Sequence, residues 1–287
     1  MQTKKHAYLI IAHSNFYVLE IALKLIDDER NDVYIHIDKK VKDFDFEYYC
    51  GLCRFSNVYF TKKRYSVKWG SPVLVKAEML LFDMAYKNKY DYYHLISGSD
   101  LPIKSQDHIH SFFDANRYQF ITATDLDIYR FRLSKFNFDL GIPINKKAAP
   151  YLYTIQNKLK IDRMKHDNHT IYKGSEWVSI SHECVGLLLR NKRWIMKRIR
   201  FSLCADEIYK QTVILNSHIA NKVYPGGNMR LIDWERRENE SPHTFTIDDY
   251  EMIMESDCLF ARKFVAEKDR EIIDKIYRMV CDREIRA

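Results

Sequence analysis

Residues 7–26 read AYLIIAHSNFYVLEIALKLI, and this stretch decides the predicted fold. The run from Tyr8 to Ala12 is continuously apolar, which is typical of a strand that is covered on both faces of a parallel sheet. His13-Ser14-Asn15 then predicts a turn, in which Ser14 or Asn15 can cap a helix. The apolar side chains that follow recur on one helical face: Val18, Leu19, Ala22, Leu25 and Ile26.

The alternation of strand and helix continues through residue 97. Further strands are predicted at residues 33–38, 57–60 and 92–97, and a helix follows Pro72. This order predicts an α/β fold with a mostly parallel, doubly wound sheet. Ligands in such sheets bind outside the carboxyl ends of the strands. The residues to inspect are therefore those that follow the strands: His13, Asp38 and Ser97–Asp100.

The second half of the chain is less regular. Strands are predicted at residues 119–123 and 178–181, helices at 183–201 and 206–216, and a loop-rich stretch at 221–246. A final helix carries its apolar side chains at Ile272, Ile273, Ile276, Tyr277 and Val280. No internal repeat and no Gly/Ser linker divides the sequence, so we expect one compact unit.

Composition excludes several classes of protein. With 287 residues, 46% hydrophobic and 30% charged, and with few Gly and Pro, the chain is neither disordered nor repetitive. No apolar run approaches the ~20 residues of a membrane span. The N-terminal stretch lacks a small-residue cleavage site, so no signal peptide is expected. Six cysteines are too sparse for a disulfide scaffold, which predicts a reducing compartment.

Net charge does not select a partner. The 46 basic and 39 acidic residues give +7, which is compatible with nucleic acid, an anionic membrane or a phosphorylated ligand. The sequences of a phosphate-binding P-loop, a dinucleotide-binding glycine loop and a hydrolase nucleophile elbow are absent. Nucleic-acid binding would rest on charge alone and is not expected.

Two short motifs give weak signals. Cys50-Gly51-Leu52-Cys53 has the spacing of half a zinc site, but the remaining cysteines are scattered singly, so a chance match is favoured. Asp125-Leu126-Asp127 could hold Mg²⁺ or Mn²⁺ against a diphosphate. It does not follow the strand that ends at Ser97, where such a metal would be needed, and a surface turn is favoured.

The predicted helix at residues 183–201 is strongly basic. Its six cationic side chains are Arg190, Lys192, Arg193, Lys197, Arg198 and Arg200. A basic amphipathic helix can lie on anionic lipid, or it can pack its apolar side inward and leave the charges in water. Both alternatives stay open, and the solvated face is favoured.

Five longer blocks carry a more specific signal. They are HLISGSDLPIK (94–104), KGSEWV (173–178), ADEIYKQT (205–212), NMRLIDW (228–234) and LFARKF (259–264). In this order, from Tyr8 to about Tyr277, the chain resembles the core-2/I-branching β-1,6-N-acetylglucosaminyltransferases and peptide O-xylosyltransferases of glycosyltransferase family 14, in a bacterial-type form. The resemblance implies a GT-A-like fold, a UDP-sugar donor, inversion at the anomeric carbon, and no cofactor or divalent metal.

The same resemblance implies an organisation for the whole chain. Residues 1–287 would form a single catalytic domain, with a nucleotide-sugar half in about 1–125 and an acceptor half in about 126–287. Inverting transfer needs a carboxylate that takes the proton of the acceptor hydroxyl. Glu207 matches the Pro-Asp-Glu position that serves as the base in the N-acetylglucosamine branch. Glu176 matches a position that is acidic in xylosyltransferases. We rank Glu207 first as the base, because both branches keep a carboxylate there, and Glu176 second.

Other residues of the donor site also follow from the resemblance. Arg262 and Lys263 fit the need for cations at the diphosphate, and Arg230 is a further candidate. Asp38 matches the uridine-binding aspartate. The remaining donor-site residues implied are Ala12, His13, Val67, Trp69, Asp100, Trp177 and Ser241. Trp177 could stack on a sugar ring or simply fill the core.

We therefore expect an inverting, metal-independent enzyme that moves a sugar from a UDP-sugar to a glycan or lipid-linked oligosaccharide. N-acetylglucosamine is the first choice of sugar, while xylose or another sugar of the same family stays open. A sugar-nucleotide-binding protein without catalysis is the alternative. Animal members are Golgi membrane proteins with a stem and disulfides. The present sequence instead predicts a cytoplasmic enzyme, with peripheral contact at the inner face of an anionic membrane.

Overall fold

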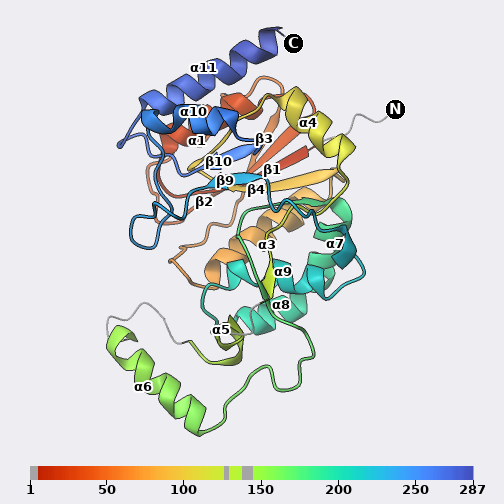
Figure 1. The fold of residues 1–287 in the computed structure, drawn as a ribbon, viewed down its shortest axis with the longest axis vertical. Coiled ribbons are helices and arrows are strands. Elements are labelled where there is room, and N and C mark those ends of the chain that lie inside the picture. Colours follow the sequence, from red (N-terminus) through yellow and green to blue (C-terminus); the bar gives the residue numbers. More distant parts are fainter. Residues whose placement is uncertain (1–5, 126–128, 138–144, 287) are drawn as a thin grey trace.

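A mixed sheet with five strands, in the order β3-β2-β1-β4-β8, forms the centre of the molecule (Figure 1). The computed structural model describes residues 6–125, 129–137 and 145–286. The strands are β1 (His6–Ala12), β2 (Asn31–Ile37), β3 (Asn57–Phe60), β4 (Tyr92–Ser97) and β8 (Val178–Ser181). The first four are parallel, and β8 is antiparallel to β4. The predicted α/β class with a mostly parallel sheet is confirmed.

Strand β1 is apolar throughout because helices cover both faces of the sheet. Ala7, Leu9 and Ile11 lie in a core shared with α3 (Val73–Tyr86) and α7 (His182–Arg190). Tyr8, Ile10 and Ala12 lie in the core on the other face, together with side chains of α1 (Phe16–Ile26) and α4 (Gln106–Ala115). Successive side chains of a strand point to opposite faces, so a strand between two layers of helices is apolar at every position.

Two smaller sheets complete the fold. The strands β5 (Asp100–Pro102), β10 (Phe260–Arg262) and β9 (Arg230–Ile232) pair in the order β5-β10-β9. The other sheet is β6 (Thr124–Asp125) with β7 (Tyr172–Lys173). Of the Asp125-Leu126-Asp127 motif, only Asp125 falls within the described residues, where it ends β6.

Three predictions for the second half are wrong in detail. The helix predicted at 183–201 is two helices, α7 and α8 (Lys192–Ile199), because the backbone of Asn191 leaves the helical conformation (φ −87°, ψ 6°) and its side-chain amide donates to the Leu187 carbonyl at 2.9 Å. The helix predicted at 206–216 begins as a 3-10 turn, η2 (Ala205–Glu207), before α9 (Tyr209–Leu215). Residues 119–123 form only isolated bridges, at Gln119 and Phe120.

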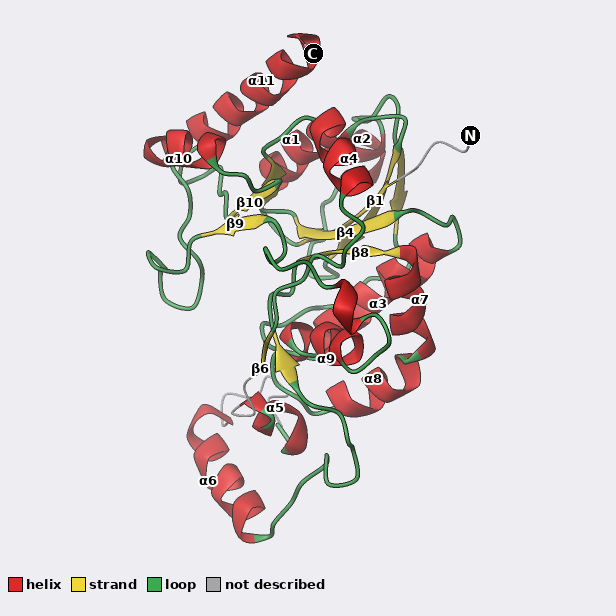
Figure 2. Ribbon diagram, turned by 45° about the vertical axis from the view of Figure 1, so that its right-hand side comes forward, coloured by secondary structure: helices red, strands yellow, loops and turns green. Residues whose placement is uncertain are grey.

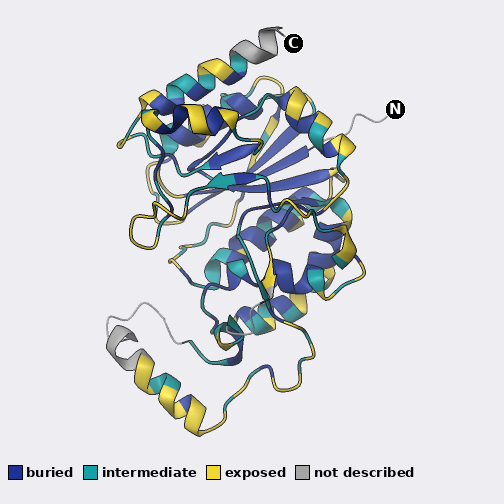
Figure 3. Ribbon diagram, viewed as in Figure 1, coloured by how far each residue is buried: buried dark blue, intermediate teal, exposed yellow. Residues whose placement is uncertain are grey.

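The remaining elements surround these layers. They are α2 (Phe46–Cys50), α5 (Phe131–Ser134), α6 (Asn145–Lys158), η3 (Ala220–Lys222), η4 (Ile247–Asp249), α10 (Tyr250–Glu255) and α11 (Glu271–Arg286). Helix α6 projects away from the rest of the chain in both views (Figures 1 and 2), and most of its described side chains are exposed (Figure 3). No helix in the described ranges combines the length and apolar character needed to cross a membrane.

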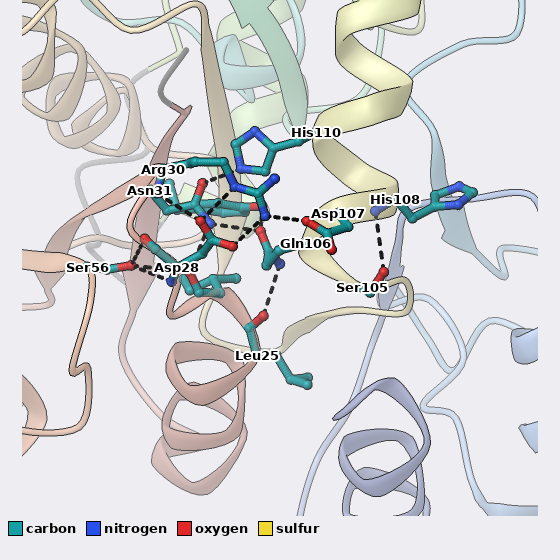
Figure 4. A network of polar contacts seen from close by, with 12 residues as sticks. Leu25, Asp28, Arg30, Asn31, Ser56, Ser105, Gln106, Asp107, His108 and His110 are labelled. Carbon is teal, nitrogen blue, oxygen red and sulfur yellow. Dashed lines mark hydrogen bonds and ion pairs between the residues drawn. The ribbon is translucent and has the colours of Figure 1, made fainter. Parts of the chain in front are cut away.

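A polar network fastens the amino-terminal edge of the sheet (Figure 4). Arg30 Nη2 lies 2.6 Å from Asp28 Oδ2 and 2.6 Å from Asp107 Oδ1. Gln106 donates to the Leu25 carbonyl at 2.9 Å and accepts from Asn31 Nδ2 at 2.8 Å. These bonds tie the start of α4 to the end of α1 and the start of β2. The opposite, carboxyl edge of the sheet carries the residues that the sequence analysis selected for inspection.

Cys50 and Cys53 are not joined to each other. None of the six cysteines, all of which lie within the described ranges, forms a disulfide. Cys50 ends α2, and burial raises the pKa of its thiol; burial raises the pKa of Cys53 to about 12. A thiol with a raised pKa is a poor nucleophile and metal ligand at neutral pH. These pKa values agree with the favoured interpretation of the C-x-x-C as a chance match.

Candidate active site

The ends of β1 and β2 meet at Asp38. The Asp38 amide donates to the Ala12 carbonyl at 2.9 Å. Its buried carboxylate accepts from the Lys40 amide through Oδ1 at 2.7 Å and from the Val67 amide through Oδ2 at 2.9 Å. Asp38 therefore holds two loops in place, and it brings the predicted Ala12 and Val67 segments against one another at the carboxyl edge.

His13 follows Ala12 at this edge. Partial loss of solvent lowers the pKa of its imidazole, and the nearby Asp38 carboxylate opposes the shift. The Lys40 and Lys263 charges lower the pKa further. His13, Asp38 and Lys263 thus lie within electrostatic reach of each other, although they come from widely separated parts of the chain.

The turn after β4 places Asp100 beside Arg262. Asp100 accepts hydrogen bonds from the Ser97 amide, at 2.9 Å, and from the Ser97 hydroxyl, at 2.5 Å. Asp100 and Arg262 are paired in register between β5 and β10, and Arg262 Nε lies 3.6 Å from Asp100 Oδ1. A Cβ added at Gly98 would lie 2.7 Å from the Ala12 Cβ. The turn is therefore packed directly onto the end of β1.

Arg262 has donors that are not used by the protein. Its guanidinium carbon lies 4.6 Å from the centroid of the Trp177 ring, a cation–π arrangement. Its Nε and Nη1 atoms are buried, and no described residue accepts a hydrogen bond from them. Burial and the Arg262 charge lower the pKa of the neighbouring Lys263. An anion with several oxygens would satisfy the free donors of Arg262 and relieve the repulsion between the two cations.

Glu176 precedes Trp177 and faces a crowded set of charges. Its Oε1 atom is buried and has no hydrogen-bond partner within the described chain. Burial raises the pKa of this carboxyl well above its usual range, and Asp206 and Glu78 raise it further. Lys210 and Arg262 oppose that shift. Such a carboxyl accepts a proton more readily than an ordinary surface glutamate does.

Glu207 has a different environment. Its Oε2 atom lies 2.7 Å from Arg132 Nη1 and 3.5 Å from Lys173 Nζ. Its backbone carbonyl also accepts from the Gly174 amide at 2.8 Å, which joins η2 to the segment that carries Glu176. Arg132, on α5, was missed by the sequence analysis, because a single arginine in an irregular stretch gives no pattern.

A second group of residues that sequence reasoning missed lies behind Glu176. Lys210 Nζ is 2.6 Å from Glu78 Oε2, and both side chains are fully buried. Tyr209 donates to the same Glu78 oxygen. Burial, followed by the Glu78 charge, raises the pKa of the adjacent Asp206 to about 7. Seven buried side-chain atoms of described residues in this region have no hydrogen-bond partner. They are Glu78 Oε1, Arg132 Nε, Glu176 Oε1, Asp206 Oδ1, Gln211 Oε1, and Nε and Nη1 of Arg262.

Arg230 is not placed as expected. Its Nη2 donates to the Val178 carbonyl at 2.7 Å and to the Ser179 hydroxyl at 3.0 Å, and Nη1 donates to the Asn228 carbonyl. Burial lowers the pKa of its guanidinium to about 9. These bonds direct its donors into the backbone of β8. The geometry therefore favours a structural role over the predicted contact with a diphosphate.

The two outermost predicted residues lie on loops. Trp69 is 70% exposed and, with Phe201 and Leu203, lines a small cleft before α3. Ser241 exchanges backbone hydrogen bonds of 3.0 and 3.1 Å with Glu238. The Lys263 carbonyl, which accepts from the Phe245 amide at 2.9 Å, fixes this loop close to the cationic pair.

No metal site is evident in the described part of the chain, where no group of three or more His, Cys, Asp and Glu side chains is placed to hold an ion. The carboxylate nearest to Arg262 at the carboxyl edge is the single Asp100. Metal independence stays a prediction, and binding experiments must test it.

Comparison with known proteins extends these observations. The family model described as Core-2/I-Branching enzyme matches residues 6–257. The beta-glucuronosyltransferase GlcAT14B of Arabidopsis thaliana is 24% identical over 288 residues, which cover 94% of this chain and 64% of that protein. The xylosyltransferase oxt of Drosophila pseudoobscura pseudoobscura is 24% identical over 268 residues, with 84% and 29% covered. The chain thus spans less than two thirds of the length of these relatives.

Solved structures add little to this. The apo structure of the WbbM bifunctional glycosyltransferase aligns with 78% of this chain and 38% of that chain, at 12% identity and a TM-score of 0.37. Overlap at this level assigns neither fold nor function.

Proposed function

Because the chain belongs to the Core-2/I-Branching enzyme family, whose model matches residues 6–257, we propose that it is a glycosyltransferase. It moves a sugar from a UDP-sugar to a hydroxyl of a glycan or lipid-linked acceptor, with inversion at the anomeric carbon and without a metal ion. Family membership is consistent with the GT-A-like class for the sheet. The observation that carries the proposal is that Arg262, which has buried donors without a hydrogen-bond acceptor, acts electrostatically on Glu176, whose Oε1 atom also lacks a hydrogen-bond partner.

The diphosphate is assigned to Arg262 and Lys263. Arg262 offers two buried donors, Nε and Nη1, that make no hydrogen bond in the described chain, and Lys263 adds a compact charge. Asp38 and the loop bonded to it accept the nucleoside, since they lie at the ends of neighbouring strands. As the sugar leaves UDP, negative charge grows on the diphosphate, and fixed cations stabilise that charge without rearrangement.

On their environments we propose Glu176 as the base, ahead of Glu207, which the sequence ranks first. Glu207 Oε2 is occupied by Arg132 and Lys173, which lie 2.7 and 3.5 Å from it. Glu176 has an oxygen without a hydrogen-bond partner, and burial raises the pKa of its carboxyl, so it takes up a proton more readily than an exposed glutamate does. Glu207 then has a positioning role, through its links to Arg132 and to the Gly174 amide.

The transfer step balances with these groups alone. The acceptor oxygen attacks the anomeric carbon on the face opposite UDP, and the new carbon–oxygen bond forms as the bond to the diphosphate breaks. The electron pair of that bond goes to the phosphate oxygen beside Arg262 and Lys263. The proton of the acceptor hydroxyl goes to Glu176.

The sugar is the open part of this proposal. N-acetylglucosamine was the first choice from sequence, whereas the relatives named above are a glucuronosyltransferase and a xylosyltransferase. A UDP-release screen with UDP-N-acetylglucosamine, UDP-xylose and UDP-glucuronate identifies the donor. Release from one of the three that is abolished in Arg262→Ala supports the proposal. UDP binding with no release from any donor, under any acceptor tried, would favour a binding protein without catalysis.

A further inference from the structure

A cavity of about 320 Å³ lies between α3, α8 and the segment that follows β3. Helices α3 and α8 lie on the same side of the central sheet in both views (Figures 1 and 2), and they share one apolar core. The volume falls at the lower end of the ~300–1,000 Å³ that is usual for small-molecule sites. None of the residues that line this cavity is assigned above to the donor or to the transfer step.

The floor of the cavity is apolar. All three segments contribute to it, with the side chains of Tyr65, Met79, Leu80 and Met196. The segment after β3 is fixed to the sheet, because the Tyr65 amide donates to His36 Nε2 at 2.9 Å and the Tyr65 carbonyl accepts from the Lys39 amide at 2.9 Å. A surface that is formed before binding spares a ligand the cost of ordering it.

Exposed ammonium groups surround this floor. They belong to Lys63, Lys76 and Lys192. On α3, Lys76 precedes Leu80 by four positions, and on α8, Lys192 is followed by Met196 at the same interval. Residues at this spacing share one face of a helix, so each helix presents a cation and an apolar side chain together. The Lys63 ammonium lies 4.9 Å from the centroid of the Tyr65 ring.

The cations around the cavity outnumber the acids that pair with them. Lys192 Nζ lies 3.8 Å from Asp83 Oδ1, and both side chains are about half exposed. Among the described residues, no carboxylate forms an ion pair with Lys63 or Lys76. A simple anion would leave the apolar floor in water, and an apolar molecule would leave the positive charge uncompensated. The combination fits a ligand that carries an anionic head and an apolar chain.

We propose that this cavity binds one molecule of an anionic lipid. Its phosphate lies among Lys63, Lys76 and Lys192, and the first methylene groups of its chains lie on the apolar floor. The inference goes beyond the proposed sugar transfer and does not rest on it. It also differs from the attraction of a basic helix to a membrane surface, because a cavity binds a single lipid molecule from solution.

Calorimetry with a short-chain lipid tests the binding. Dihexanoyl phosphatidate, kept below its critical micelle concentration, is titrated into the full chain, and one molecule per chain is expected to bind. Dihexanoyl phosphatidylcholine has the same chains without net charge, and inorganic phosphate has the charge without chains. Each should bind about tenfold more weakly or less, because each lacks one of the two contributions.

The two unpaired lysines are tested by substitution. Lys63→Gln/Lys76→Gln should weaken the binding of phosphatidate by about tenfold or more, since each cation beside an anionic lipid contributes about fivefold. The matched control, Lys87→Gln/Lys165→Gln, removes two exposed lysines that do not line the cavity and should leave the affinity unchanged. Equal affinities for the two double variants overturn the proposal.

Methionine methyl signals locate the bound lipid. In protein labelled with ¹³C at the methionine methyl groups, the signal of Met196 is assigned by its loss in Met196→Leu. Phosphatidate should shift this signal and leave those of Met252 and Met279 in place, since these two methionines are exposed on other helices, at 42% and 37%. Shifts of similar size at all three methionines would mean that the lipid coats the surface, which overturns the proposal.

The remaining outcomes separate the cavity from other sources of binding and from the proposed function. Binding to anionic vesicles without binding to dispersed phosphatidate would leave only attraction to a membrane surface, and phosphate that binds as tightly as phosphatidate would leave an anion site. Either result overturns the proposal. Binding that requires Lys63 and Lys76 and shifts the Met196 signal supports it even if no UDP-sugar is turned over.

Discussion

Arg262 shows how single side chains define the site. Its buried donors have no acceptor in the described chain, although its ring contact with Trp177 fixes the guanidinium in place. We predict that UDP binds in excess EDTA, and that Arg262→Ala weakens binding by ~1.5–3 kcal/mol, the usual value of a lost hydrogen bond to a charged group. Calorimetry with UDP measures both effects.

Arg278 provides the control for that substitution. It is exposed on α11, so Arg278→Ala removes the same charge without touching the site. An affinity for UDP that collapses on chelation would show that a metal is required. Equal affinities for Arg262→Ala and Arg278→Ala would remove Arg262 from the diphosphate site.

The positions of site residues could be predicted from sequence where they follow strands, and not where they depend on distant packing. Asp38 comes directly after β2, and Asp100 follows the end of β4 by a short turn, so local pattern and topology placed them at one edge. Glu78 sits within an apolar stripe of α3, and Lys210 lies 132 positions further along the chain. No local pattern announces such a pair, and the sequence analysis therefore missed both residues.

The bounds of strands and helices could likewise be predicted where a local pattern sets them, and not where a single side chain ends an element. Residues 92–97 were predicted as a strand with the observed bounds, because the stretch YYHLIS is rich in aromatic and branched side chains and is followed by a turn sequence. The break at Asn191 was missed, since the helical spacing continues across it. There the backbone of Asn191 turns out of the helical conformation, its side-chain amide donates to the Leu187 carbonyl, and α7 ends.

The segment that leads to Glu176 depends on a glycine. A Cβ at Gly174 would lie 1.7 Å from the Thr122 carbonyl oxygen, so the strand β7 and its continuation would have to move. We predict that Gly174→Ala destabilises the protein by ~1–3 kcal/mol or more, as overpacking of a core does. Urea unfolding measures the loss.

Gly51→Ala is the matched substitution. An added Cβ there meets atoms at 3.5 and 3.6 Å, which is ordinary contact. Its cost should stay within ~0.5 kcal/mol, as for most surface substitutions. Similar losses for the two variants would mean that the segment before Glu176 adjusts freely, which contradicts the close approach to Thr122.

Helix α8 packs its apolar side inward, as the favoured alternative requires. Ile195 and Ile199 are buried, and Arg198 is turned to Asp167, with Nη2 2.7 Å from Oδ2. The cations that remain exposed on or beside this helix are Arg190, Lys192, Arg193, Lys197 and Arg200. They form a basic surface, for which membrane contact stays a prediction.

Liposome flotation tests that contact. We predict that the protein floats with anionic vesicles and less with neutral ones, since each surface cation adds about 1 kcal/mol near anionic lipid. Arg193→Glu/Lys197→Glu should lose this difference. The control, Lys87→Glu/Arg278→Glu, makes the same change in net charge on exposed residues elsewhere and should keep it. Equal recovery of wild type with both lipids would leave these charges as a solvated face.

The stability of the whole molecule should depend on pH through buried histidines. Burial lowers the pKa of His36 and of His110 to about 4, and that of His94 well below its usual range. Unfolded histidine titrates near ~6.5, so below that pH the unfolded chain binds protons that the folded chain does not. This part of the stability is complete above ~pH 6.5 and is lost progressively as pH falls toward 4.

His110→Gln isolates one of these contributions. Glutamine can still donate to Asn31 Oδ1, which His110 Nε2 contacts at 3.0 Å. Between pH 7 and pH 5 the variant should lose ~2 kcal/mol less than wild type in the free energy of unfolding from urea. His108→Gln, at an exposed position of the same helix, is the control. Losses that are the same for His110→Gln and His108→Gln would contradict the account of the buried imidazole.

Sugar transfer by the intact chain gives the most direct test of the site as a whole. Single-turnover transfer is measured at saturating donor for Glu176→Gln and Glu207→Gln, each of which keeps the size of the side chain. We predict that Glu176→Gln slows transfer by ~10²–10⁴, the usual contribution of a positioned base, while its donor affinity stays within a few-fold. Glu207→Gln should cost less. Transfer near the wild-type rate in Glu176→Gln, with Glu207→Gln inactive, would contradict the account.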